Sequence, residues 1–282
     1  MSITANAENI KAIVLDLDGT ALAPGGKLNE RTIRAVKACS ECGLKVIINT
    51  GRTVDSAEPF RAALGIEGLM IYCNGAMIFD MPEDRPVRTI LLDKEVASFC
   101  ARLAKDLSVY CQVFFPSDKE KNKTVIITES ESPEREMYFN HAGRRAVLGD
   151  LKEILSRPDL DGCIKAMFLA EPDVLESLRL KIDERFGNSI YMALTLKTFL
   201  EVMNAGVSKG NGLQFVMDQY SLKREEVLAF GDEENDLPMF AVAGFSAAPE
   251  NAKESVKAAA GIVIGSNAED GVAAFLEETF RL

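Results

Sequence analysis

The chain has 282 residues, which is enough for one large domain or two of moderate size. Its 47% hydrophobic and 27% charged residues are typical of a soluble globular protein. The formal net charge of −11 argues against binding to nucleic acid or to an acidic membrane surface, because either would require a basic patch. No apolar run approaches the roughly 20 residues that span a bilayer, and the first segment lacks a signal-peptide pattern. We therefore expect a cytoplasmic protein, and no obligate protein partner is evident from the sequence.

The first strong signal is the segment 13–20, where an apolar run ends at two carboxylates and a Gly-Thr turn. Such a run predicts a central strand of a parallel sheet, and these sheets bind ligands at the carboxyl ends of their strands. Alternate side chains point to opposite faces, so Asp16 and Asp18 share one site only if the backbone bends, which Gly19 permits. The alternative is an Asp-rich turn that merely closes the strand. Two such carboxylates would repel each other without a cation, which favours a functional role.

The following segments continue this buried α/β style. A helical pattern over residues 29–42 leads to a strand at 45–50, which ends at Thr50 and Gly51 before another helix. A hydroxyl and backbone N–H groups at a helix start can bind an anion, although a simple helix-capping Thr is an equally good interpretation. A third apolar strand is predicted at 69–73. Strands and helices that alternate at this spacing indicate right-handed crossovers and a doubly wound, Rossmann-like α/β sheet.

The pattern changes near residue 82. Several of the predicted strands that follow are separated by short turns, which favours antiparallel hairpins over crossovers. We expect an inserted α+β domain at residues 83–203, with residues 1–82 and 204–282 forming the core. The predicted elements of the insertion are strands at 90–92, 109–115, 124–128, 164–169, 189–194 and 199–202, and helices near 94–107, 150–155 and 174–186.

The buried α/β style returns after residue 206. A helix begins at Lys209, and an apolar strand ends at Asp232, which is followed by Asn235 and Asp236. Parallel strands share one carboxyl edge, so the groups at the ends of three strands can converge with Lys209 into one site. The alternative for Lys209 is that it only begins a surface helix.

The cysteines and the single histidine suggest no other catalytic site. The six cysteines are scattered through apolar segments, so we expect free thiols rather than a disulfide framework. Cys39 and Cys42 have redox or zinc spacing, but they fall within a helical pattern and no second pair follows. His141 is distant from every carboxylate motif, which argues against a serine- or cysteine-hydrolase triad.

Together these motifs resemble the haloacid dehalogenase superfamily of phosphoryl-transfer enzymes, whose pattern is an Asp-x-Asp, a Thr or Ser after the second strand, a Lys and a late acidic cluster. The resemblance to its Cof-type subfamily covers essentially the whole chain and implies a large α+β (class IIB) cap at residues 83–203. Residues 248–252 depart from the subfamily's usual Met-Gly-Asn-Ala. The stretches that carry the subfamily resemblance are Asn74-Gly75-Ala76, the segment 207–213, Gly231-Asp232-x-x-Asn235-Asp236-x-x-Met239 and Glu269-Asp270-Gly271-Val272.

The resemblance also implies a chemical role for each motif. Asp16 would be the nucleophile that forms an aspartyl phosphate, and Asp18 would act as general acid and then general base. Mg²⁺ would be held by the Asp16 carboxylate, the Asp18 backbone carbonyl and Asp232, because this cation prefers oxygen ligands. Thr20 and Asp236 would hold these ligands in place without binding the cation themselves. The groups that would bind phosphate oxygens are the Thr50 hydroxyl, the Gly51 N–H, Lys209 and the Asn235 amide.

The predicted function is a Mg²⁺-dependent phosphatase of small phosphorylated metabolites, with sugar phosphates or similar monoesters as the expected substrates. One alternative is a phosphomutase of the phosphomannomutase-like type, which would return the phosphoryl group to the sugar instead of releasing it to water. Another is a non-catalytic binding protein on this fold, which the intact Asp16, Asp18, Lys209 and Asp232 argue against. The sequence does not name the substrate, because fold analogy does not assign one.

Overall fold

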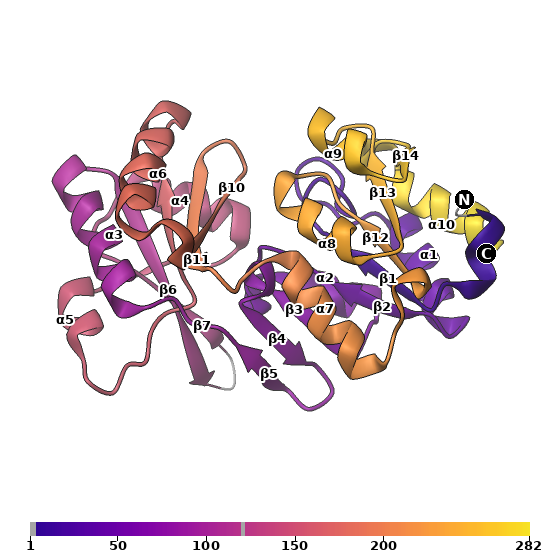
Figure 1. Cartoon of the computed structure of the whole chain (residues 1–282), viewed down its shortest axis with the longest axis horizontal. Coiled ribbons are helices and arrows are strands. Elements are labelled where there is room, and N and C mark those ends of the chain that lie inside the picture. Colours follow the sequence, from indigo (N-terminus) through magenta and orange to yellow (C-terminus); the bar gives the residue numbers. More distant parts are fainter. Residues whose placement is uncertain (1–3, 120–121) are drawn as a thin grey trace. The chain divides into compact units, whose positions relative to one another are not determined.

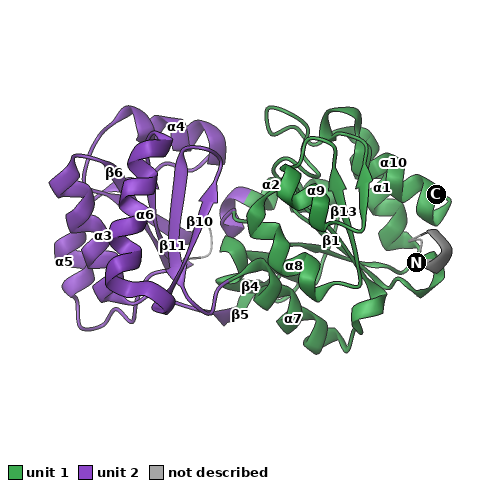
Figure 2. Ribbon diagram, turned by 45° about the horizontal axis from the view of Figure 1, so that its top comes forward, with its two compact units in different colours: residues 1–51, 57–87, 208–282 green, residues 52–56, 88–207 purple. Residues whose placement is uncertain are grey.

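The computed structural model describes residues 4–119 and 122–282 (Figure 1). Its helices and strands group into two compact units, which are described separately (Figure 2). The sequence of unit 2 interrupts that of unit 1. Unit 1 contains residues 1–51, 57–87 and 208–282, and unit 2 contains residues 52–56 and 88–207.

The centre of unit 1 is a five-stranded parallel sheet with the strand order β14-β13-β12-β1-β2. The apolar run at the start of the chain forms β1, which is buried throughout because strands pair with it on both sides. The strands of unit 1 are β1 (Ala12–Leu15), β2 (Lys45–Ile48), β3 (Leu69–Tyr72), β4 (Met77–Asp80), β5 (Arg85–Thr89), β12 (Val227–Phe230), β13 (Phe245–Pro249) and β14 (Ile262–Ile264). Its helices are α1 (Glu30–Glu41), α2 (Val54–Leu64), α7 (Lys209–Tyr220), α8 (Leu237–Val242), α9 (Glu254–Ala259) and α10 (Gly271–Phe280). The last two residues of β5 and the first three of α2 belong to unit 2.

Helices cover both faces of this parallel sheet. On one face, Leu213 of α7 and Phe240 of α8 join Ala229 in a hydrophobic cluster. On the other face, Phe275 of α10 contacts Phe230 edge-to-face, with ring centroids 5.8 Å apart. Neighbouring strand residues point to opposite sides, so Ala229 and Phe230 of β12 each contribute to a different layer. The predicted fold class, an α/β protein with a doubly wound parallel-sheet core, is confirmed.

The third predicted strand, β3, pairs differently from the prediction. A single parallel bridge between Asn49 and Ile71 joins it to the edge of the parallel sheet. Its main partner is β4, with which it forms an antiparallel pair, and β5 adds a third strand to this small sheet. The prediction of β3 as a regular parallel strand is therefore wrong, and the strand expected at 90–92 lies instead at 85–89. The chain reverses direction after β3 through a turn at residues 73–75.

Unit 2 is built on a six-stranded sheet with the order β10-β11-β9-β6-β7-β8, in which only β7 and β8 pair in parallel. One face is covered by α3, α5 and α6, where Ala97, Leu151 and Leu178 pack with Val113 and Leu200. The elements of this unit are β6 (Tyr110–Lys119), β7 (Asn122–Thr128), β8 (Val147–Leu148), β9 (Lys165–Leu169), β10 (Ile190–Thr195), β11 (Phe199–Asn204), α3 (Lys94–Leu107), α4 (Pro133–Ala142), α5 (Leu151–Ser156) and α6 (Pro172–Phe186).

The helix α4 packs on the opposite face of this sheet and is absent from the sequence prediction. Its Tyr138 contacts the rings of Phe114 and Phe199, whose neighbours Val113 and Leu200 point to the first face. A second buried residue of α4 is Arg135, whose guanidinium donates hydrogen bonds to a backbone carbonyl. An arginine does not contribute to an apolar pattern, so the sequence lacks the periodicity that would predict this helix.

A buried ion pair lies in the sheet of unit 2. The side chains of Lys165 on β9 and Glu201 on β11 are 1% and 3% exposed, and Lys165 Nζ lies 2.5 Å from Glu201 Oε1. The ammonium group also lies 4.8 Å from the centroid of the Phe114 ring. Each charge offsets part of the desolvation cost of the other, because buried ions are stabilised by an opposite charge at close range.

The cysteines are free thiols, as predicted. Cys39 is buried in α1, whereas Cys42 is exposed at the end of that helix, so the two do not form a common site. Burial, with a smaller contribution from Cys42, raises the pKa of Cys39 to about 12. At neutral pH this thiol is therefore protonated and unreactive.

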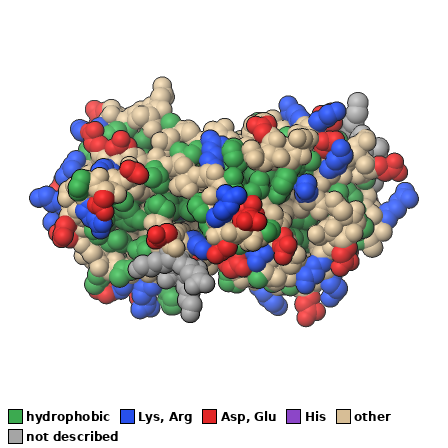
Figure 3. Space-filling model, turned by 90° about the horizontal axis from the view of Figure 1, so that it is seen from below, with side chains coloured by type: hydrophobic (Ala, Val, Ile, Leu, Met, Phe, Trp, Pro, Cys, Tyr) green, Lys and Arg blue, Asp and Glu red, His purple; other side chains and the backbone are tan. Residues whose placement is uncertain are grey.

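The surface carries charges of both signs. On the face drawn in Figure 3, basic and acidic side chains of the described residues are mixed with one another. None of the helices in residues 4–119 and 122–282 combines the length and the apolar character that a bilayer-spanning segment requires.

Candidate active site

Two acidic residues follow neighbouring strands at the same edge of the parallel sheet. β1 and β12 are paired so that Leu15 lies beside Phe230, which places Asp16 and Asp232 just beyond the carboxyl ends of these strands. The N–H of Asp16 continues the pairing by donating to the Phe230 carbonyl at 3.1 Å. Both side chains are buried. The pairing of the two strands therefore fixes where the two carboxylates meet.

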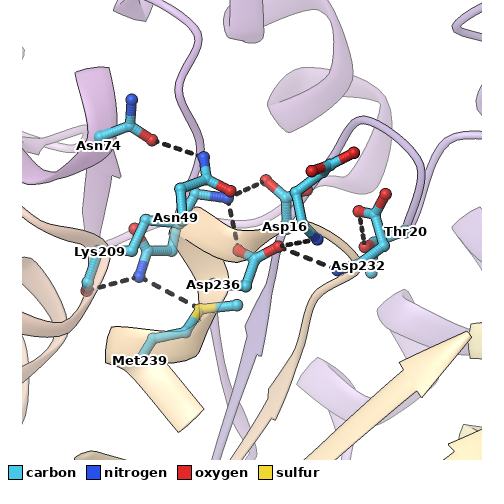
Figure 4. Close-up of polar contacts among 10 residues, drawn as sticks. Asp16, Thr20, Asn49, Asn74, Lys209, Asp232, Asp236 and Met239 are labelled. Carbon is cyan, nitrogen blue, oxygen red and sulfur yellow. Dashed lines mark hydrogen bonds and ion pairs between the residues drawn. The ribbon is translucent and has the colours of Figure 1, made fainter. Parts of the chain in front are cut away.

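Lys209, the first residue of α7, lies between two carboxylates (Figure 4). Its Nζ is 2.6 Å from Asp16 Oδ1 and 2.6 Å from Asp236 Oδ1, and its side chain is 1% exposed. The Nδ2 of Asn49 donates to the Lys209 carbonyl at 2.9 Å and so holds the start of the helix from the end of β2. Lys209 is therefore part of a buried charge cluster, and the alternative of a surface-helix lysine is wrong.

Asp236 organises the loop that carries Asp232. It is completely buried, and its Oδ1 accepts from Lys209. Its Oδ2 accepts from the backbone N–H groups of Asp232 at 2.9 Å and Glu233 at 3.0 Å. Because both oxygens are engaged, Asp236 orients the lysine and the loop rather than presenting a free carboxylate.

The turn after Asp16 passes directly over Asp232. The hydroxyl of Thr20 donates to Asp232 Oδ1 at 2.7 Å. Gly19 has a φ of +79°, and a Cβ on it would lie 2.1 Å from Asp232 Oδ2. Only glycine therefore fits this position. Asp18, which precedes Gly19, is half-buried, and its backbone bridges to Leu22.

Burial dominates the electrostatics of the cluster. It raises the pKa of Asp16 well above its ordinary value, and Lys209 opposes this shift while Asp236 and Asp232 add to it. Burial and then Asp236 raise the pKa of Asp232 to about 7, against the lowering effect of the Thr20 hydrogen bond. Burial lowers the pKa of Lys209, but the carboxylates of Asp16 and Asp236 outweigh it and leave this pKa above its ordinary value. The lysine is thus a permanent cation.

The predicted phosphate-binding groups from β2 and from the loop after β12 meet at Asn74. Thr50 is buried, and its carbonyl accepts from the Asn74 N–H at 3.0 Å. The Asn74 carboxamide lies against Gly51, because a Cβ on Gly51 would be 3.3 Å from Asn74 Oδ1. The same Oδ1 accepts from Asn235 Nδ2 at 2.9 Å (Figure 4).

The predicted site residues thus fall into two connected sets. Direct contacts join Asp16, Thr20, Lys209, Asp232 and Asp236, either to one another or through the Asp232 loop. Thr50, Gly51 and Asn235 are linked to one another through Asn74, and Asp18 lies two residues beyond Asp16 in the same turn.

Two further residues of the site, Asn49 and Asn74, have no role in the sequence prediction. Both are completely buried: Asn49 directly follows β2, and Asn74 is the second residue after β3. Their positions in the sequence could have identified them, because Asn49 precedes the predicted Thr50 and Asn74 is the first residue of a subfamily motif. A buried asparagine at a strand end needs hydrogen-bond partners, and here those partners belong to the site.

The acidic cluster has the donors that a hard divalent cation requires. Carboxylate oxygens of Asp16, Asp232 and Asp236 lie within 4.8 Å of one another, and Mg²⁺ prefers such ligands. Asp236 already has both oxygens in hydrogen bonds, so Asp16 and Asp232 are the better ligands. The pKa values of these two residues are raised, so a nearby positive charge would stabilise their ionised forms. The residues therefore fit a divalent cation.

A doubly wound core with three buried carboxylates and a buried lysine at one sheet edge defines an α/β protein with a carboxylate–lysine site. The pattern of the haloacid dehalogenase-like hydrolase family matches residues 13–276. The chain belongs to this family, as its motifs predicted.

Named relatives and a solved structure extend the same likeness over almost the whole chain. The 5-amino-6-(5-phospho-D-ribitylamino)uracil phosphatase YitU of Bacillus subtilis is 27% identical, covering 96% of this chain and 97% of the relative. The pyridoxal phosphate phosphatase YbhA of Escherichia coli is 28% identical, covering 94% and 97%. The structure of a haloacid dehalogenase-like hydrolase from Bacteroides thetaiotaomicron superimposes with a TM-score of 0.82 at 25% identity, covering 95% and 98%. These names support the predicted enzyme class, a phosphoric monoester hydrolase of this superfamily.

Proposed function

We propose that this protein is a Mg²⁺-dependent phosphatase that hydrolyses small phosphorylated metabolites, such as sugar phosphates, through an aspartyl-phosphate intermediate. The observation that carries the proposal is the contact of Lys209 with both Asp16 and Asp236, beside Asp232, at one edge of the sheet. The named relatives act on phosphorylated small molecules, which supports the substrate class. We further propose residues 1–82 and 204–282 as the catalytic core and residues 83–203 as the cap.

Asp16 is the nucleophile of this scheme. Lys209 holds one of its carboxylate oxygens at 2.6 Å, which orients the second for in-line attack on phosphorus. Burial favours the neutral acid, and Lys209 opposes this shift, so the lysine promotes the anionic form of Asp16 that attacks phosphorus. Attack forms a bond from Asp16 to phosphorus as the bond to the leaving alcohol breaks.

Asp18 carries the proton in both half-reactions. It donates the proton to the leaving alcohol, and then accepts one from the water that attacks the aspartyl phosphate. Asp18 is half-buried, whereas Asp16 and Asp232 are buried. The phosphate oxygens are bound by the Thr50 hydroxyl, the Gly51 N–H, Lys209 and the Asn235 amide.

Mg²⁺ would be held by the Asp16 carboxylate, the Asp18 backbone carbonyl and Asp232. When bound, it supplies the positive charge that offsets repulsion between the phosphate dianion and the carboxylate nucleophile. Thr20 fixes Asp232 through its hydroxyl, and Asp236 fixes the same loop through two backbone N–H groups. These supports keep Asp232 in place before the cation arrives.

The test is a screen of phosphorylated metabolites with Mg²⁺, in which release of inorganic phosphate is measured. Asp16→Asn should abolish turnover with little change in thermal stability, because it removes the nucleophile but almost no volume. Asp18→Asn should lower kcat by roughly 10²–10⁴-fold, and it should weaken Mg²⁺ binding less than Asp232→Ala does. Asp16→Asn activity within tenfold of wild type would refute the mechanism, and return of the phosphoryl group to the sugar would indicate a mutase.

A further inference from the structure

Three successive residues after β3 have left-handed backbone conformations. Their φ angles are +51° at Cys73, +57° at Asn74 and +99° at Gly75. For a residue other than glycine this conformation costs about 1–2 kcal/mol. No residue other than glycine fits at position 75, because its Cβ would lie 2.3 Å from the Ser208 carbonyl oxygen. Such a turn persists only where its surroundings hold it, and turns of this kind cluster at functional sites.

The turn directs Asn74 between two of the proposed phosphate-binding segments. Its backbone N–H donates to the Thr50 carbonyl, and its carboxamide lies against Gly51. Its Oδ1 accepts from Asn235 Nδ2 at 2.9 Å. In Figure 4 this hydrogen bond is the dashed line that runs from Asn74 to an unlabelled side chain. One completely buried side chain therefore contacts groups from two different strand ends.

The Asn235 carboxamide depends on this contact for its orientation. Within residues 4–119 and 122–282, its Nδ2 donates to Asn74, while its Oδ1 is buried and accepts no hydrogen bond. The terminal torsion of an asparagine has broad, shallow preferences, so its hydrogen bonds decide how the amide plane is turned. With one N–H bound to Asn74, the direction of the second N–H is set as well.

We propose that Asn74 is a positioning residue of the phosphate pocket: its side chain aims the second N–H of Asn235 at a phosphate oxygen, while its backbone N–H holds the Thr50–Gly51 segment beside it. This inference rests on the proposed function, in which Asn235 binds phosphate. A purely structural role would instead make Asn74 a buried polar group whose loss lowers stability but does not act through Asn235.

The substitution that isolates the side chain is Asn74→Gly. Glycine adopts the left-handed conformation without strain, so the fold should persist, which thermal unfolding verifies. We expect kcat/KM for a hydrolysed phosphate ester to fall by about 10- to 100-fold, the scale of a misplaced contact. The affinity for inorganic phosphate, measured by calorimetry with Mg²⁺ present, should fall as well. In an Asn235→Ala background, Asn74→Gly should change either quantity by less than about twofold, because the two residues act as one unit.

A matched control is Ser221→Gly, which changes another left-handed residue, at φ +53°, on the exposed end of α7. This control should leave kcat/KM and the affinity for inorganic phosphate at the wild-type values. The inference is overturned if Asn74→Gly binds inorganic phosphate as the wild type does. It is also overturned if the fold-loss of the double variant equals the product of the fold-losses of Asn74→Gly and Asn235→Ala, because the two residues would then act independently. A wild-type protein that hydrolyses no ester, yet binds phosphate in an Asn74-dependent way, would refute the proposed function alone. Failure of the wild type to bind phosphate at all would overturn both.

Discussion

Lys209→Met tests whether the buried charge cluster is organised as the structure indicates. Methionine is nearly isosteric with lysine, so it fills the same space without the ammonium group. The substitution leaves Asp16 and Asp236 facing each other without the cation that now lies 2.6 Å from each. Both carboxylates are buried, so water cannot replace the lost partner.

Breaking a buried ion pair by removing one partner costs about 3–5 kcal/mol. For a chain of this size, each kcal/mol lowers the melting temperature by about 2–4 °C, so the transition of unit 1 should fall by roughly 6–20 °C. Activity should fall below detection, because Lys209 also orients Asp16 and contacts phosphate in the proposed mechanism. A lysine that merely began a surface helix would produce neither effect.

The loss of stability should depend on pH in a direction that the pKa shifts fix. Burial already holds the pKa of Asp16 well above its ordinary value of 3.8, and Lys209 is the group that lowers it. Without the lysine this pKa rises further in the folded protein. A raised folded-state pKa contributes stability that is present below the unfolded value and is lost as the pH rises through the folded value. The variant should therefore be closest to wild type near pH 5 and furthest from it near pH 8.

The assay is thermal and urea unfolding of both proteins between pH 5 and 8, in EDTA so that no metal compensates for the missing charge. Lys209→Met combined with Asp16→Asn provides the internal control, because it removes a negative charge together with the positive one. This double variant should regain much of the stability but none of the activity. A deficit below about 1 kcal/mol that is the same at both ends of the pH range would match a surface salt bridge and refute the reasoning.

Two further substitutions probe single contacts. Gly19→Ala should weaken Mg²⁺ binding by about 10- to 100-fold, because the new Cβ would lie 2.1 Å from Asp232 Oδ2. The control is Gly25→Ala: Gly25 has a similar φ of +81° but open space around it, so this variant should bind Mg²⁺ as the wild type does. Calorimetry separates the two, and equal losses would mean that backbone strain alone is responsible. In unit 2, Glu201→Gln should lower stability by about 3–5 kcal/mol, because it removes the carboxylate charge 2.5 Å from the buried Lys165 ammonium group. Adding Lys165→Met should restore most of this stability in urea unfolding. A double variant no more stable than Glu201→Gln would contradict a dependence on charge.

The position of the candidate site follows from features that a sequence expresses directly. Asp16 and Asp232 each follow a continuous apolar run, and such runs predict neighbouring parallel strands whose ends share one edge. The register of β1 and β12 then places the two carboxylates side by side. Lys209 joins them because the helix that it begins packs on one face of the same sheet.

The contacts that depend on polar side chains in the interior are not visible in such patterns. Arg135 is buried in α4 and Lys165 in β9, where an apolar pattern would require apolar residues. The reversal after β3 depends on a left-handed backbone at Cys73 and Asn74, which no propensity favours for a cysteine. In each case a specific tertiary hydrogen bond, ion pair or packing contact overrides the local preference, and these partners are distant in sequence.

The charge balance of the cluster determines the expected order of binding. Carboxylate oxygens of Asp16, Asp232 and Asp236 lie within 4.8 Å of one another, and the ammonium group of Lys209 contacts the first and the last of these residues. A phosphate dianion that approached them would meet an excess of negative charge, and two unit charges 4 Å apart repel by about 4 kcal/mol at an effective dielectric constant near 20. Burial raises the pKa values of Asp16 and Asp232, and the neighbouring carboxylates add to this rise. Lys209 cannot offset the excess of negative charge alone, because Asp236 shares that lysine with the nucleophile. A divalent cation held by Asp16 and Asp232 is therefore expected to precede the phosphate ester.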